Sequence, residues 1–404
     1  MPLPPFKYLI TIEPLGLLYG SSGRFLSPEN LVGRSGSQFP PSTAVLSGLI
    51  AAHYAQHTET KQILDDTLKP LCLAGPFWRW THTANTDKEN FYVPTPINCL
   101  AKLHPQHDET KVPQGALVNR LAWDDQGWQP LREDTSGKPE GNTWVAINDW
   151  NRLNQWQPNQ QEPVVYGDPW RYIPHLHPYL MENERRVDTD RERGSLFLEN
   201  GVQIHPETCL VYLSNLEVED GWYRFGGEGH MVDLTCHTIS ENSELRKLLS
   251  QPLGRSFALI TPAVWGSNRL SYRSPRPLKK GDNARHQLEP VDSDLAKLWE
   301  LDALITERPS PFRYRFGNRK NNQNQDIQQP NQPKALSRGR YAVPSGSVYV
   351  LKNEFPANQS TWQQWPLDWF PREGPSLKRW GCGLALPLPG ALANDLPVTQ
   401  PTAN

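Results

Sequence analysis

Proline and glycine recur so often along this chain that they limit its helices and strands to short runs. The 404 residues include 39 prolines and 28 glycines. Proline fixes φ and lacks a backbone N–H, and glycine increases the entropic cost of ordering the backbone, so both residues interrupt regular elements. With 15 tryptophans also present, the composition predicts many short strands and long, packed loops rather than extended helices.

Length and cysteine content set the expected domain count and compartment. At about 150 residues per domain, the chain should form two or three domains. Its five cysteines include no C-x-x-C pair, so neither a disulfide framework nor a zinc ribbon is encoded. The N-terminus lacks a signal-peptide pattern, and nowhere do about 18 apolar residues run together. We therefore expect a cytoplasmic, soluble protein with no membrane partner.

Charge is distributed unevenly. Residues 255–340 hold 16 Lys and Arg residues against 8 Asp and Glu residues, a net charge of +8, which leaves −10 for the rest of a chain whose total is −2. A basic region within an acidic chain is compatible with a nucleic-acid partner in spite of the total charge.

Two basic runs lie inside this region. One covers residues 269–286, and the other, residues 308–320, interleaves arginines with Phe312, Tyr314 and Phe316. Cations that hold phosphates and aromatic faces that stack on bases suit single-stranded nucleic acid. Two alternatives stay open: a solvated basic loop and, for the aromatic residues, the buried face of a strand.

Apolar periodicity locates several elements. A helical stripe predicts a helix that begins after Ser42 as N-cap; its members are Val45, Leu46, Leu49, Ile50 and Tyr54. The patterns further predict strands at 8–12, 208–218 and 256–266, a hairpin over 186–204 with its turn near Gly194, and a short helix at 241–251.

The segment WYRFGGEGHMVDL, Trp222 to Leu234, contains more glycine than a hairpin requires. A tight hairpin needs only about two turn residues, so the three glycines between Gly226 and Gly229 indicate that a ligand backbone comes close. Arg224 and His230 frame this loop, and cations beside exposed N–H groups are typical of a phosphate-binding nest. A wide hairpin turn with a bulge is the alternative.

The chain carries no recognisable catalytic or metal motif. No nucleophile elbow, Walker A loop or two-metal acidic cluster stands out. His53 and His57 are spaced i, i+4, but without a third ligand nearby in the sequence they indicate no metal site. The sequence therefore predicts no metal, no cofactor and no catalytic residue, and leaves His53 and His230 as the acid/base candidates of a metal-free ribonuclease.

In their order along the chain, several segments resemble the family of the third subunit of the Cmr complex, the type III-B CRISPR effector. These segments are FPPSTAVLSGLI at the first helix, RVDTDRERGSLF, the GGEGH loop, VPSGSVYVL and a late GCG. The resemblance covers residues 5–56, 184–236 and 340–384. The family belongs to the RAMP (repeat-associated mysterious protein) superfamily and caps the 5′ end of the guide RNA.

The resemblance implies an α+β fold of two ferredoxin-like, RRM-like RAMP domains with long loop insertions and a protruding β-hairpin thumb. Residues 1–200 would form the first domain, with the thumb-like hairpin. Residues 201–404 would form the second, with glycine-rich loops and a disordered Asn/Gln-rich insert at 321–333.

The resemblance also implies a function without catalysis. The protein would bind and cap the 5′ repeat-derived tag of a CRISPR guide RNA, dock the large polymerase-like subunit, and adjoin the backbone RAMP subunit, in antiviral defence. Two alternatives stay open. One is a stand-alone RAMP endoribonuclease that processes CRISPR transcripts by acid/base chemistry, and the other is a structural protein whose basic region binds an acidic partner.

The implied RNA-binding residues fall into three segments and two further positions. The GGEGH loop and the arginine before it contribute Arg224, Gly226, Gly227, Glu228, Gly229 and His230; the thumb-like segment contributes Arg186 and Arg191; the late loop contributes Lys378, Arg379, Gly381 and Gly383; Arg24 and Ser42 complete the set. His230 stands where the family more often has arginine, and a histidine is mostly neutral at pH 7.

Overall fold

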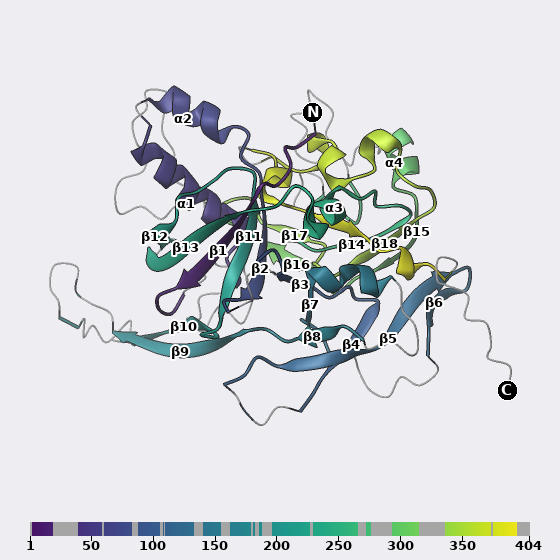
Figure 1. Cartoon of the computed structure of the whole chain (residues 1–404), viewed down its shortest axis with the longest axis horizontal. Helices are drawn as coiled ribbons and strands as arrows, with labels where there is room; N and C mark the ends of the chain where they lie inside the picture. Colours follow the sequence, from purple (N-terminus) through teal and green to yellow (C-terminus); the bar gives the residue numbers. More distant parts are fainter. Residues whose placement is uncertain are drawn as a thin grey trace.

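The structure of the chain is a computed structural model in which the described residues are 2–18, 39–58, 60–82, 88–105, 108, 110–132, 140–154, 162–178, 181, 186–187, 196–226, 229–265, 272–275, 293–314, 336–372 and 375–393. Its helices and antiparallel sheets give an α+β fold, as expected (Figure 1). Within these ranges, no helix is both long enough and apolar enough to cross a membrane.

A long antiparallel sheet contains the first strand of the chain. This strand, β1 (Tyr8–Pro14), lies between β13 (His230–Thr238) and β11 (Thr208–Ser214), and β11 pairs on its other side with β2 (Leu73–Trp80). Each neighbouring pair is antiparallel. Both strands that flank β1, β11 and β13, therefore come from the part of the chain after residue 201.

The predicted strand at 8–12 is confirmed, and β1 is buried on both faces. Ile10 and Ile12 pack with Leu46 and Ile50 of α1 (Thr43–Gln56) in one core. Leu9 points the other way, into the core that the C-terminal part of the chain shares. Because side chains alternate between faces along a strand, one strand supplies both cores. The predicted helix after Ser42 is confirmed as α1, beside α2 (Lys61–Leu68).

The long sheet extends at both ends. β12 (Gly221–Phe225) pairs with β13 at one edge. Beyond β2 follow β3 (Tyr92–Pro94), β7 (Trp144–Ala146), β8 (Val164–Tyr166), β5 (Gln114–Asp124) and β4 (Cys99–Leu103), while β6 (Gly127–Pro130) pairs with β5. The 3-10 helix η3 (Ile147–Leu153) follows β7.

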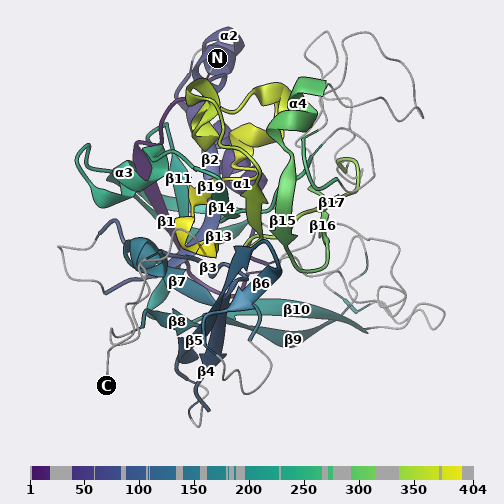
Figure 2. The ribbon, with the colours of Figure 1, turned by 90° about the vertical axis from the view of Figure 1, so that its right-hand side faces the viewer.

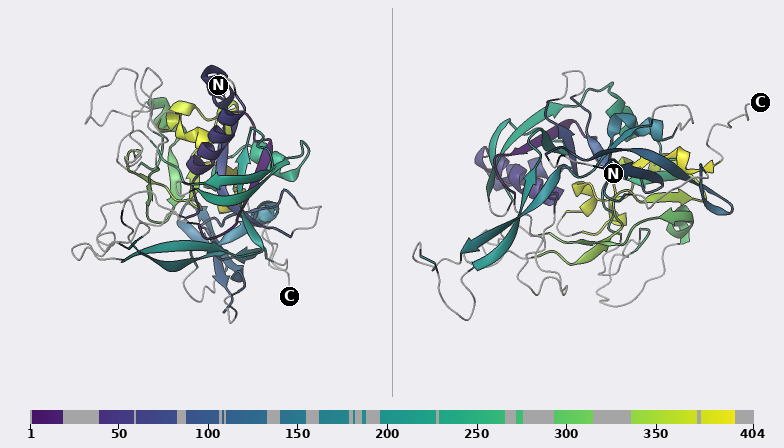
Figure 3. Two further views of the ribbon diagram at one scale, coloured as in Figure 1. Left: turned by 90° about the vertical axis from the view of Figure 1, so that its left-hand side faces the viewer. Right: turned by 90° about the horizontal axis from the view of Figure 1, so that it is seen from below.

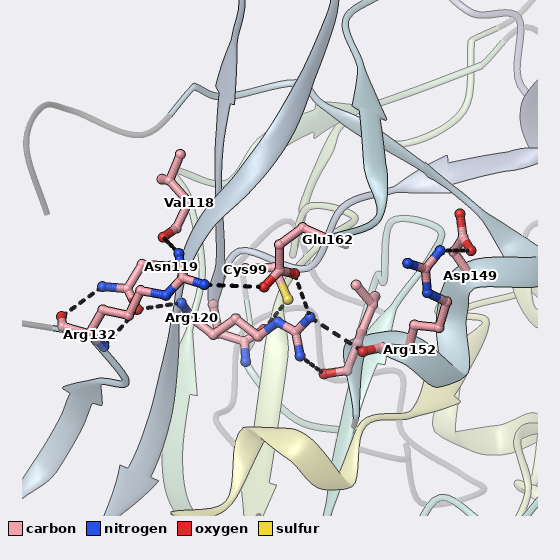
Figure 4. A network of polar contacts seen from close by, with 10 residues as sticks. Cys99, Val118, Asn119, Arg120, Arg132, Asp149, Arg152 and Glu162 are labelled. Atoms are coloured by element: carbon pink, nitrogen blue, oxygen red, sulfur yellow. Dashed lines mark hydrogen bonds and ion pairs between the residues drawn. The ribbon is translucent and has the colours of Figure 1, made fainter. Parts of the chain in front are cut away.

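A buried arginine of β5 joins this strand to η3 and to the residues before β8 (Figure 4). The Arg120 side chain is 2% exposed, and its guanidinium lies 3.2 Å from the carboxylate of Glu162. The same guanidinium donates to the carbonyl oxygens of Arg152 and Leu153 at the end of η3. Arg132 also reaches Glu162, at 3.6 Å. A buried charge is tolerated only with such partners, so this network connects the end of η3 and Glu162 to strand β5.

The C-terminal part forms a second antiparallel sheet, seen above the strands β4 and β5 in Figure 2. Its spatial order is β19 (Ala385–Pro387), β14 (Ser256–Leu259), β18 (Val348–Leu351) and β15 (Leu301–Ile305). The associated helices are α3 (Glu244–Ser250), α4 (Ser293–Leu298), η4 (Ala357–Gln359), η5 (Trp362–Gln364), η6 (Leu367–Trp369), η7 (Leu377–Trp380) and η8 (Pro389–Ala391). β16 (Ser310–Phe312) and β17 (Arg340–Ala342) form a separate pair.

Two of the predicted elements in this part need comment. The short helix at 241–251 is confirmed as α3, with the Ser243 side chain accepting from the Arg246 N–H as a cap. The strand predicted at 256–266 ends at Leu259. The chain then turns through Pro262, and Trp265 enters a cluster with Trp299, Trp365 and Phe370. A single antiparallel bridge between Ala263 and Val343 and this aromatic packing together place the residues after the strand.

A two-stranded hairpin projects from the body (Figure 3). It pairs β9 (Trp170–Pro178) with β10 (Leu196–Ile204). The hairpin predicted over 186–204 is therefore wrong in its first strand, because β10 pairs with residues 170–178 instead. Gly194, the predicted turn, lies outside the described residues. β9 contains Pro174, which in a longer sheet would break a ladder, but the outer edge of a two-stranded ribbon accommodates proline.

Candidate nucleic-acid interface

The tip of the β12–β13 hairpin is a glycine turn. Gly226 has φ +78° and Gly229 has φ +68°, and the Gly229 N–H donates to the Gly226 carbonyl at 3.3 Å. Both conformations favour glycine. A Cβ on Gly226 would meet no described atom within 4 Å, so the space beside the turn is open. Gly227 and Glu228 lie outside the described residues.

One face of this hairpin is exposed. Trp222 is 71% exposed and Met231 is 40% exposed, and Arg224, which pairs with Met231, is exposed as well. Tyr223 and Phe225, at the intervening positions, pack into the core with α1. An aromatic ring beside a cation on an uncovered sheet face can stack on a base and contact a phosphate.

Trp222 is a functional candidate that sequence reasoning missed. The signal was present in the alternation of Trp222 and Arg224 with Tyr223 and Phe225, because alternate residues of a strand share a face. Leu15, 55% exposed, adjoins this surface, since its N–H donates to the Met231 carbonyl at 3.1 Å. We call Leu15, Trp222, Arg224 and Met231 the hairpin surface.

His230 and Arg224 do not frame the loop together. His230 pairs directly with Phe225, whereas Arg224 pairs with Met231. Directly paired residues project from the same face of a sheet, and Phe225 is buried. The half-buried His230 therefore lies on the face toward α1, opposite to Arg224, so the two side chains do not flank the turn from the same face.

Of the two arginines predicted in the thumb-like segment, only Arg186 belongs to the described residues. Arg186 is exposed, and its carbonyl accepts from the Met181 N–H at 2.9 Å; Arg191 lies outside the described residues. The base of the β9–β10 hairpin is joined to the loop after β1 by two backbone hydrogen bonds between Leu18 and Val202. Because Leu15 precedes Leu18 by three residues, a short stretch of chain connects the hairpin surface to the base of the β9–β10 hairpin.

The late loop places Lys378 inside the protein. Lys378 is 0% exposed, and its ammonium donates to the carbonyl oxygens of Gln363 and Trp365 and lies 5.1 Å from the centre of the Trp362 ring. Burial lowers the pKa of Lys378 to about 7, opposed by Cys72. With internal partners and no exposed surface, Lys378 is positioned to support the fold rather than to contact RNA.

The residues after Lys378 also contact other parts of the same chain. Arg379 donates to the carbonyl oxygens of Leu71 at 3.1 Å and Leu68 at 3.3 Å. Gly381 has φ +72°, and a Cβ there would lie 2.5 Å from the Cα of Ala74. Gly383 has φ +67° and is also buried. These glycines allow close approach of the chain to itself.

Two predicted site residues remain, Ser42 and Arg24. Ser42 occupies the N-cap position of α1, but its side chain makes no capping hydrogen bond. The Thr43 hydroxyl donates to the Trp380 carbonyl at 2.7 Å, so the start of α1 lies beside the late loop. Arg24 lies outside the described residues.

The described residues include only parts of the two basic runs. In the second run Tyr314 is 6% exposed and packs edge-on against Trp380, with ring centroids 4.8 Å apart. Arg313 donates to the Ser337 carbonyl at 3.1 Å. Tyr314 is therefore a buried residue of the fold rather than a ring exposed for stacking on bases. Phe316 and most of the first run lie outside the described residues.

A cavity of about 890 Å³ lies where β13, η3 and the start of α3 meet. Its polar lining includes Lys88, Glu89 and His237. Burial lowers the pKa of His237, Arg79 and Lys88 act in the same direction, and Asp220 opposes them. None of the predicted site residues lines this cavity.

Comparison with known proteins gives one family and several solved structures. The model of the family described as "CRISPR-associated protein (Cas_Cmr3)" matches residues 10–389. A chain of a structure described as "Cryo-EM structure of the Type III-B Cmr-beta bound to cognate target RNA" is 12% identical, with 85% of this chain and 86% of that chain covered and a TM-score of 0.41. A chain of the "Crystal structure of Csm3-Csm4 subcomplex in the type III-A CRISPR-Cas interference complex" is 10% identical, with 86% and 94% covered and a TM-score of 0.31. No curated protein matches the sequence.

Proposed function

Because the chain belongs to the Cas_Cmr3 family of CRISPR-associated proteins, we propose that it is a non-catalytic subunit of a type III-B ribonucleoprotein that binds and caps the 5′ repeat-derived tag of the guide RNA. The observation that carries this proposal is the hairpin surface, where Trp222 and Arg224 project from an uncovered sheet face. Stacking and phosphate contact need no sequence-specific hydrogen bonds, in keeping with a protein that grips the end of a guide while base pairing reads its target.

The strand orders support two ferredoxin-like units. In the first sheet, β13, β1, β11 and β2 stand in the order fourth, first, third and second, with α1 between the first two along the chain. In the second sheet, β19, β14, β18 and β15 have the same order, with α4 in the matching place. We place the boundary between β13 and β14, within residues 239–255, rather than after residue 200, because β11 and β13 pair with the first unit.

The proposed partners follow from the family and the chemistry. Within the complex, the protein would dock the large polymerase-like subunit and adjoin the backbone RAMP subunit. Guide RNA would lie along the hairpin surface and contact the exposed Arg186, in the segment that connects β9 and β10. The complex would act in the cytoplasm.

The direct test is RNA binding by the full chain. Labelled single-stranded RNA that carries the repeat-derived 5′ tag is titrated with wild type, Trp222→Ala and Arg224→Glu. Loss of a stacking partner should weaken binding about tenfold, since stacking contributes about 1–3 kcal/mol per base. Lys297→Glu, a charge reversal on the exposed side of α4, is the matched control and should bind like wild type. Equal binding by all four proteins would remove the hairpin surface from the proposal.

The endoribonuclease alternative is tested separately. Wild type is incubated with repeat RNA, and the products are separated by length. We expect no site-specific cleavage. Cleavage that is lost in His53→Ala or His230→Ala would favour the enzyme, because acid/base catalysis depends on such a side chain.

A further inference from the structure

Two histidines at the C-terminal end of α1, one within the helix and one at its C-cap, lie beside a third potential metal ligand from a distant part of the sequence. His53 and His57 lie one helical turn apart, with ring centroids 4.8 Å apart. Glu219 comes from the loop between β11 and β12. The ligand atoms of the three residues all lie within 4.8 Å of one another.

Tyr223 determines which nitrogen of His53 is available. Its hydroxyl oxygen lies 2.7 Å from the Glu219 carbonyl oxygen and 3.2 Å from His53 Nδ1. A carbonyl only accepts, so the single hydroxyl hydrogen is donated to Glu219, and the tyrosine oxygen accepts from His53 Nδ1–H. Nε2 then carries the lone pair, which is the arrangement found where the other ring nitrogen of a metal-bound histidine is held by a hydrogen bond.

The loop that carries Glu219 is held on both sides. The Tyr54 hydroxyl donates to the Glu217 carbonyl at 2.9 Å, and the Tyr223 hydroxyl holds the Glu219 carbonyl. Between them, Val218 is 2% exposed and packs in the core with α1. The backbone at Glu219 is thereby fixed against the helix that carries the histidines, while the carboxylate remains exposed.

Closing the site requires only side-chain movement. In a tetrahedral zinc site, ligand bonds of about 2.0–2.2 Å place the ligand atoms about 3.3–3.6 Å from one another. The present separations are up to 4.8 Å. Because the side chains of His57 and Glu219 are exposed, rotation about their χ angles can supply the difference without moving the backbone.

We propose that His53, His57 and Glu219 bind one divalent transition-metal ion of the Zn²⁺ class, which ties α1 to the loop that leads into β12. Two imidazoles and one carboxylate favour such an ion over Mg²⁺ or Ca²⁺, which prefer oxygen ligands. The three ligands leave one position for water. This site lies on the α1 side of the hairpin, and its existence does not depend on RNA binding.

The test is metal binding by the full chain, prepared without a histidine tag and stripped with a chelator. Zn²⁺ is titrated in competition with a chromophoric chelator, and Co²⁺ is added separately to record the absorption of the bound ion. We expect one equivalent of Zn²⁺ and a rise in the thermal midpoint of unfolding. His57→Ala and Glu219→Gln should each weaken binding about tenfold or more and abolish most of that rise.

Two variants control for binding elsewhere. His104→Ala removes an exposed histidine at the end of β4, and Cys236→Ser removes the half-buried thiol of β13; both should retain wild-type affinity. Glu219→Gln keeps the size of the side chain, so its thermal midpoint without metal should match wild type. Affinities in His57→Ala and Glu219→Gln equal to that of wild type would overturn the proposal, as would the absence of saturable binding in wild type.

Discussion

Two loops of this protein combine glycines with neighbouring cations, and they lie in opposite surroundings. At the β12–β13 turn, Gly226 is exposed with open space beside it, and Arg224 is exposed on the adjoining strand. In the late loop, a Cβ on Gly381 would collide with backbone atoms of β2, and Lys378 is fully buried. Positive φ is common to both pairs of glycines.

The difference shows that glycine beside a cation does not by itself identify a ligand site. A positive φ explains why each position is glycine, but the atoms around it determine what the loop can contact. Where the neighbours belong to the same chain, the glycine serves packing. Where the space is open, a ligand has access, and the adjoining Trp222 and Arg224 provide chemistry that suits RNA.

The largest expected difference between the loops is in stability. Gly381→Ala should lower the free energy of unfolding by about 3 kcal/mol, because a left-handed alanine costs about 1–2 kcal/mol and the clash with Ala74 and Leu73 adds overpacking. Gly226→Ala should cost only the conformational part, about 1 kcal/mol. Chemical denaturation of both variants measures the contrast. Similar losses would mean that the open and packed loops are energetically alike.

The buried cation should make stability depend on pH. Burial lowers the pKa of Lys378 to about 7 from its usual value of 10.5. Between these values the unfolded chain holds a proton that the folded chain has released, so stability relative to Lys378→Met should rise with pH, by up to about 1.4 kcal/mol per pH unit. Unfolding at pH 7, 8 and 9 tests this. A pH-independent difference between the two proteins would show that Lys378 stays charged in the fold.

Arg379 should contribute to stability through its two carbonyl partners. Arg379→Ala is expected to lower the free energy of unfolding by about 1.5 kcal/mol. Arg379→Lys should recover only part of the loss, since a lysine cannot reproduce the two-pronged geometry. RNA affinity of the folded variants should equal that of wild type. A change in affinity with unchanged stability would return Arg379 to the RNA-binding set.

The smallest expected stability effect is at the exposed cation. Arg224→Ala should change the free energy of unfolding by less than about 0.5 kcal/mol, as is usual for exposed positions. Its effect should appear instead in RNA binding, where the slope of log affinity against log salt should fall by about 0.7, the value for one phosphate contact on a single strand. An unchanged slope would indicate that Arg224 contacts no phosphate.

Local patterns in the sequence were sufficient for several elements. The strand β1, the helix α1, the helix α3 and the β12–β13 hairpin all follow from apolar periodicity or glycine placement, which depend on residues within a few positions of one another. The prediction failed where pairing is long-range. The pattern pairs β10 with the residues just before it, but its partner β9 is separated from it by residues 179–195, and the prolines of β9 interrupt the alternation that indicates a strand.

The class of fold, the periodic elements and the order of segments that is typical of the family all follow from the sequence alone. Which cations are buried, on which face His230 lies, and that Glu219 lies beside His53 and His57 can be seen only in the folded chain, because burial and site geometry depend on segments that folding brings together. Lys378 is covered by Gln363 and Trp365, and the α1 histidines are completed by a loop beyond β11.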